Sequence, residues 1–110
     1  MSEAVNTSPA PAVKENKRVS PHSLEAEQSV LGAVIIHNPS FEKLIDLLTA
    51  EDFHYKAHRL LFETISILYH KDKPFDLLSL TEYLKSINQL KCIDGGESYL
   101  FTLSSMVASA

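Results

Sequence analysis

The apolar residues of this chain recur at intervals of three and four along most of its length, which is the spacing of one face of a helix. The pattern is clearest between Ser23 and Pro39, where a Pro that cannot continue a helix follows the apolar stripe. Ser23 can accept a backbone N–H, and Glu25 and Glu27 place negative charge near the positive end of the helix dipole. We therefore predict a first helix over 24–36. Its inward stripe consists of Leu24, Leu31, Val34 and Ile35.

The same spacing continues beyond this helix, and no stretch shows a sustained two-residue alternation. An Asp94-Gly95-Gly96 run predicts a turn before the last apolar segment. Asp76 stands where a helix N-cap is expected. The fold class is therefore predicted to be all-α, a compact bundle of about six short helices. The remaining helical segments are expected at 40–48 (with Leu47 buried), 49–53 (a capped turn), 55–69, 77–88 (with Ile87 inward) and 97–106.

The first 19 residues differ from the rest of the chain in composition. Pro, Ser, Asn, Ala and Lys dominate this stretch, and few sizeable apolar side chains interrupt it. Such a segment cannot bury enough surface to offset the entropy lost on ordering. We therefore expect a disordered tail over residues 1–19 and one helical domain over residues 20–110.

Charge separates the same two parts. The chain has 110 residues and a formal net charge of −4. Residues 1–19 hold three basic and two acidic residues, so the remainder carries a balance of −5. Because non-specific DNA affinity comes mainly from Lys and Arg, an acidic domain is a poor electrostatic match for phosphates.

No pattern of catalytic or metal-binding residues emerges. The chain lacks a phosphate-binding GxxxxGK[ST] loop, and Cys92 is its one cysteine. His54 and His58 are four residues apart, but no acidic general base stands between them, so we expect no metal site and interpret His58 as a core residue with a satisfied ring nitrogen. We predict no catalytic, cofactor-binding or metal residues, no membrane span and a cytoplasmic protein.

Several motifs occur in a fixed order that resembles the N-terminal domain of DnaB-family replicative helicases. Ala57, Glu97 and Ala108 depart from the family pattern. The matching elements are SLEAEQSVLG from Ser23 to Gly32, Glu51-Asp52-Phe53 with His58, Pro74-Phe75-Asp76-Leu77 with Leu80 and Leu84, and Leu90 with Gly95-Gly96 and Tyr99-Leu100.

The resemblance implies a six-helix globule followed by a helical hairpin, in a homohexameric, ATP-dependent helicase. The domains would pair into dimers that form a collar and bind primase, and a helicase loader is a further candidate partner. ATP, Mg²⁺ and most DNA contacts would belong to a motor domain outside this chain. Much of the dimer contact would come from the hairpin, so we expect this chain alone to be a monomer or a weak dimer.

Three residues are candidates for binding a partner: Asp76, Tyr83 and Tyr99. Tyr is enriched at interfaces, although Asp76 can equally be a helix cap and both tyrosines can equally belong to the core. The alternative function is a helix-turn-helix nucleic-acid binder, which needs a basic recognition helix. A small hydrolase or metal enzyme is a third reading, favoured only if the histidines converge.

Overall fold

The computed structural model describes residues 23–108 and is all-α over that range, as predicted. The tail predicted over residues 1–19 lies outside the described residues. The described part contains five α-helices, α1 (Leu24–Ile36), α2 (Phe41–Leu44), α3 (Lys56–His70), α4 (Leu77–Ser86) and α5 (Gly96–Ala108), and three 3-10 turns, η2 (Asn38–Ser40), η3 (Ala50–Asp52) and η4 (Leu90–Cys92).

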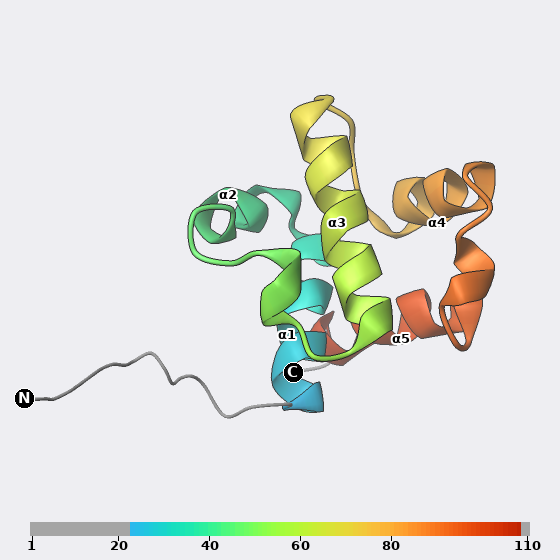
Figure 1. The fold of residues 1–110 in the computed structure, drawn as a ribbon, viewed down its shortest axis with the longest axis horizontal. Coiled ribbons are helices and arrows are strands. Elements are labelled where there is room, and N and C mark those ends of the chain that lie inside the picture. Colours follow the sequence, from blue (N-terminus) through green and yellow to red (C-terminus); the bar gives the residue numbers. More distant parts are fainter. Residues whose placement is uncertain (1–22, 109–110) are drawn as a thin grey trace, which may run out of the picture.

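Helix α3 stands at the centre of the fold (Figure 1). Helix α2 lies on one side of α3 and α4 on the other, while α1 and α5 cross below it. The most extensive helix–helix packing joins α1 to α5, two elements from opposite ends of the described chain. The chain therefore closes on itself by bringing its first and last helices together.

Helix α1 begins and ends as the sequence predicts. The Ser23 hydroxyl accepts a hydrogen bond from the Ala26 N–H at 3.2 Å. At the other end, the Asn38 side chain donates to the Val34 carbonyl at 2.9 Å. Oδ1 of the same Asn38 side chain accepts the Phe75 N–H at 3.0 Å. One side chain thus closes α1 and ties the segment before α4 to it.

The helix predicted over 40–48 is wrong in length. Only Phe41–Leu44 is α-helical, and the side chain of Leu47, predicted to be buried, is 75% exposed. The Leu44 carbonyl accepts the N–H groups of both Leu47 and Leu48, at 2.8 and 2.9 Å. This shared acceptor tightens the backbone into a turn, so the helical spacing no longer determines which side chains point inward. The capped turn predicted next is present as η3.

The helix predicted over 77–88 stops two residues early, at Ser86. Asn88 adopts a left-handed conformation with φ of +59°, and the Gln89 N–H bonds back to the Leu84 carbonyl at 2.9 Å. Asp72 follows α3 with a φ of +57°. Asn and Asp tolerate this conformation better than other non-glycine residues, so both helices end without glycine.

Two residues predicted to face inward, Leu24 and Ile87, are exposed instead. Leu24 is the first residue of α1, and Ile87 is the C-cap of α4. A residue at a helix end can keep the right spacing and still extend past the neighbouring elements that would cover it. The predicted burial of Leu24 and Ile87 is therefore wrong, because both lie at the ends of their helices.

Aromatic rings fill the core between α2 and α3. Phe41 is fully buried, and its ring centroid lies 5.4 Å from that of Phe62, 5.2 Å from Tyr69 and 5.7 Å from Phe75. Two of these pairs are edge-to-face, a favoured geometry for aromatic rings. The other buried apolar residues are Leu31, Val34, Ile35, Phe53, Leu61, Ile65, Leu68, Leu80, Leu84, Ile93, Leu100 and Leu103.

Phe41→Ala is expected to lower the free energy of unfolding by about 3–5 kcal/mol, because it removes a buried ring and leaves a cavity. Urea denaturation followed by circular dichroism measures the loss. Leu47→Ala is the matched control, expected to change stability by at most about 0.5 kcal/mol because that side chain is exposed. Equal losses in the two variants would contradict this account of the core.

Candidate partner-binding surface

A chain of hydrogen bonds joins α1, α3 and α5 around the buried side chain of His58, which is 1% exposed. Its Nδ1 lies 2.7 Å from Oε1 of Glu27, and its Nε2 lies 2.6 Å from the Tyr99 hydroxyl. The Gln28 amide donates to the same hydroxyl at 3.1 Å. The His58 and Tyr99 rings are also nearly parallel, at 13°. The prediction that His58 is a satisfied core residue is confirmed.

One set of proton positions satisfies this network. The Tyr99 hydroxyl accepts from Gln28, so its own hydrogen is available to donate to Nε2 of His58. The hydrogen on Nδ1 can then be donated to the Glu27 carboxylate. Every polar group of the network has a partner within the fold, so the Glu–His–Tyr arrangement is a structural connection between three helices.

Glu27 has a second role that the sequence reading missed. Its Oε2 accepts the His54 N–H at 2.7 Å, and its Oε1 accepts the Tyr55 N–H at 3.5 Å, immediately before α3. These groups precede a helix whose own N-cap side chain makes no capping bond. A carboxylate at the positive end of a helix dipole is favourable. Glu27 therefore caps α3, in addition to the role predicted within its own helix.

The turn before α5 positions Tyr99. Gly95 has a φ of +91°, and a Cβ added there would lie 3.2 Å from the Cβ of Tyr99. Gly96 follows with a φ of +50°. The turn predicted from the two glycines is confirmed, and the first of them lets the tyrosine pack closely against the turn.

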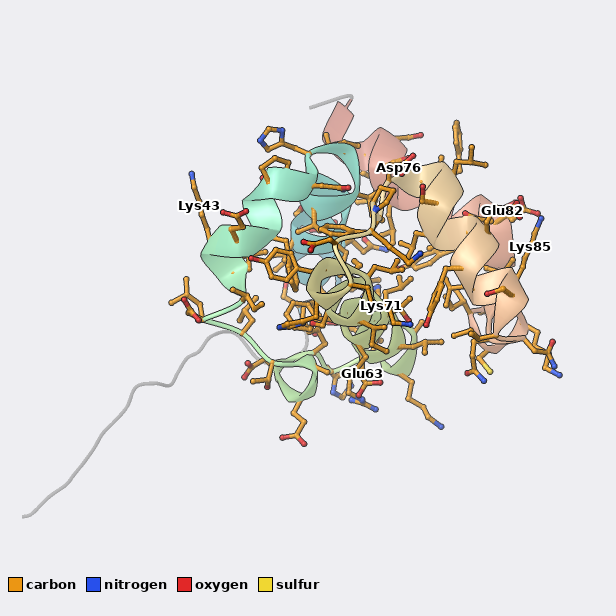
Figure 2. All side chains as sticks on the ribbon, turned by 90° about the horizontal axis from the view of Figure 1, so that it is seen from above. Lys43, Glu63, Lys71, Asp76, Glu82 and Lys85 are labelled. Carbon is orange, nitrogen blue, oxygen red and sulfur yellow. The ribbon has the colours of Figure 1, made fainter. Side chains whose placement is uncertain are left out.

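The three candidate partner-binding residues lie in different surroundings. Tyr99 is partly buried and belongs to the His58 network. Tyr83 is also partly buried against the core, and Nζ of Lys71 lies 5.8 Å from its ring centroid. Figure 2 shows Lys71 near α3, well away from Glu82 and Lys85 on the outer side of α4. Only Asp76 is exposed.

Asp76 occupies the N-cap of α4, as expected, but its side chain makes no capping hydrogen bond. Asp76 lines a shallow hollow of about 670 Å³ between α4 and α5. Neither Tyr83 nor Tyr99 lines that hollow, so the three candidates do not form one site. The residues lining the hollow are Asp76, Leu77, Leu78, Thr81, Glu97, Ser98, Phe101 and Thr102.

The sequence reading missed the apolar part of this hollow. Leu78 and Phe101 are large apolar residues, and their side chains are 69% and 62% exposed. Leu78 lies off the inward stripe of α4, which Leu80 and Leu84 mark. A large apolar residue outside a helix's buried stripe is the signal that could have indicated this surface.

Residues 23–108 contain neither a candidate metal site nor a candidate membrane span. No three His, Cys, Asp or Glu side chains within that range gather closely enough to hold a metal ion. None of the described helices is both long enough and apolar enough to cross a bilayer.

By its fold, this protein is a small all-α domain built around a central helix, and the buried histidine of that helix hydrogen-bonds to two neighbouring helices. The family model described as the DnaB-like helicase N-terminal domain matches residues 19–110. The chain therefore belongs to this family, as its motifs predicted.

Individual relatives agree with that assignment. The chain is 45% identical over 86 residues to the replicative DNA helicase DnaB of Pasteurella multocida, covering 78% of this chain and 18% of that protein. It is 33% identical over 102 residues to the Treponema pallidum replicative DNA helicase DnaB, covering 93% of this chain and 23% of that protein. This chain thus spans about a fifth of the length of these relatives.

A solved structure has the same fold. The N-terminal domain of DnaB helicase from Mycobacterium tuberculosis matches with a TM-score of 0.74 and 34% sequence identity, over 79% of this chain and 61% of that one. That domain is therefore longer than the part matched here.

Tyr99→Phe is expected to lower the free energy of unfolding by about 1–3 kcal/mol, because it leaves Nε2 of the buried His58 without a donor. Chemical denaturation measures the difference. Tyr83→Phe is the matched control, since no described residue hydrogen-bonds to its hydroxyl, and it should stay within about 0.5 kcal/mol of the parent protein. Similar losses in both variants would contradict the assignment of this loss to the His58 network.

Proposed function

We propose that this chain is a non-catalytic assembly and partner-docking domain of a replicative DNA helicase. Membership of the DnaB-like N-terminal domain family is the observation that carries the proposal. In the whole protein, the domain would support a homohexameric ring and bind primase, while a separate motor domain would use ATP and Mg²⁺ and contact DNA. A helicase loader is a further candidate partner, and the cytoplasm is the expected location.

The chemistry of the buried polar residues supports a non-catalytic role. Glu27, His58 and Tyr99 are the residues that come closest to an acid–base constellation. Each is already bonded to another part of the fold, and His58 is buried. A general base must reach a substrate proton, which these bonds and this burial prevent.

The helix-turn-helix alternative receives no support from the packing. A recognition helix must present one face to the major groove. The longest helix, α3, is central and buries six of its side chains. The exposed basic residues Lys56 and Lys71 are widely separated along it. The net charge of −5 after residue 19 also opposes binding to phosphates.

Sedimentation velocity tests the assembly part of the proposal. This chain alone is expected to be a monomer or a weak dimer. A stable interface usually buries over about 1,000 Å², and the hairpin that would supply much of that area lies outside this chain. A longer version that continues to the full length of the Mycobacterium tuberculosis domain is expected to form dimers or hexamers. A tight dimer of this chain by itself would contradict the proposal that the continuation supplies the contact.

Titration with the C-terminal domain of primase, followed by calorimetry, tests the docking part. Saturable binding without ATP turnover is the expected result for the assembled longer version. Salt-dependent binding of duplex DNA by this chain would instead favour the nucleic-acid alternative.

A further inference from the structure

The hollow between α4 and α5 combines exposed apolar side chains with carboxylates. Its two walls expose large apolar side chains, Leu78 from α4 and Phe101 from α5. Its rim carries two carboxylates, those of Asp76 and Glu97. Exposed apolar surface rimmed by polar residues is characteristic of interaction sites.

Within residues 23–108, no hydrogen bond or ion pair engages the carboxylate of Asp76. An Asp at an N-cap ordinarily accepts a backbone N–H from the first helical turn. Here that bond is absent, and the carboxylate forms no ion pair within the described chain. In Figure 2, Asp76 lies at the start of α4, far from Lys43 on α2. Capping therefore does not account for this acid, which is available to a cation from outside.

The second carboxylate is held only weakly. Nζ of Lys85 lies 3.5 Å from Glu97 and 3.8 Å from Glu82, and the three side chains are 46–63% exposed. Exposed ion pairs of this kind contribute little, so an incoming cation can compete for Glu97. No basic side chain lines the hollow itself. The electrostatic complement of this surface is therefore positive.

The apolar side chains of the hollow indicate what kind of structure the partner presents to it. Leu78 and Phe101 each lie on a helix, and a volume of about 670 Å³ leaves room for several side chains. An amphipathic helix can place apolar residues spaced by three and four into such a groove while its flanks stay in water. Basic flanks would then lie beside the two carboxylates on the rim.

We propose that the α4–α5 hollow binds a basic amphipathic helix of a partner protein, with apolar residues between Leu78 and Phe101 and a Lys or Arg beside Asp76. The inference rests on the proposed function as a docking domain and assigns that function to one surface. A second copy of the chain is a poorer occupant because its most exposed leucine, Leu47, has the acidic Asp46 and Glu51 nearby in sequence.

Fluorescence anisotropy with a designed peptide tests the proposal on the full chain. The probe is a labelled peptide of about 16 residues with Leu on one helical face and Arg on the other, a length near the limit for an isolated helix. Its counterpart has Glu in place of Arg. The Arg peptide is expected to bind saturably, more weakly at high salt, and the Glu peptide should not bind.

Two variants and their matched controls locate the binding. Phe101→Ala is expected to weaken the Arg peptide about tenfold. Asp76→Asn is expected to weaken it about threefold, since a rim charge contributes less than a buried anchor. Leu47→Ala and Asp46→Asn remove comparable side chains from the α2 side and should leave the affinity unchanged. Circular dichroism checks that all four variants remain folded.

Besides a failure of the Arg peptide to bind, four outcomes would overturn the proposal. They are equal binding of the Glu peptide, equal loss in the α2-side controls, self-association that Phe101→Ala abolishes, and peptide binding that appears only after residues 1–22 are deleted. The third would make a second copy the occupant, and the fourth would make it the chain's own N-terminal segment. If the peptide fails to bind while the longer version still assembles and binds primase, only this inference fails.

Discussion

A buried imidazole has two nitrogens that must both find partners, and in this domain each partner comes from a different helix. His58 on α3 meets Glu27 of α1 on one side and Tyr99 of α5 on the other. Because leaving either nitrogen unpaired costs about 1–3 kcal/mol, packing of the three helices that brings these groups together is favoured over packing that separates them. Apolar burial drives α1, α3 and α5 into contact, and the hydrogen bonds determine how they are aligned.

The same network connects helix ends to helix packing. Glu27 caps the start of α3 while it holds His58, so the position of α1 sets where α3 begins. Gly95 allows Tyr99 to lie close to the turn that starts α5. Among the described residues, the buried polar side chains of His58, Thr64 and Thr81 all form hydrogen bonds within the fold. The exposed side chains of Asp76, Leu78 and Phe101 line the outer hollow instead. This division is the one that the proposed docking role requires.

Predictions from the sequence were correct where a residue's own chemistry determines the local backbone or its burial. The start of α1 at Ser23, the glycine turn and the buried His58 were all predicted correctly. It failed where the outcome depends on neighbours. Leu47 has the right spacing for burial, yet the chain turns at Leu44 and exposes it. Asp76 has the right position for a cap, yet its carboxylate makes no capping bond.

The amino-acid pattern by itself determined the fold class, the approximate helix positions, the acidic character and the family, because periodicity, caps, charge and motif order are local or additive properties. Tertiary structure alone decided which helices meet, which caps are supplied from elsewhere, and where an apolar hollow is left uncovered. The physical reason is distance along the chain: Glu27 and Tyr99, or Leu78 and Phe101, are far apart in sequence, and only folding brings their side chains to one place.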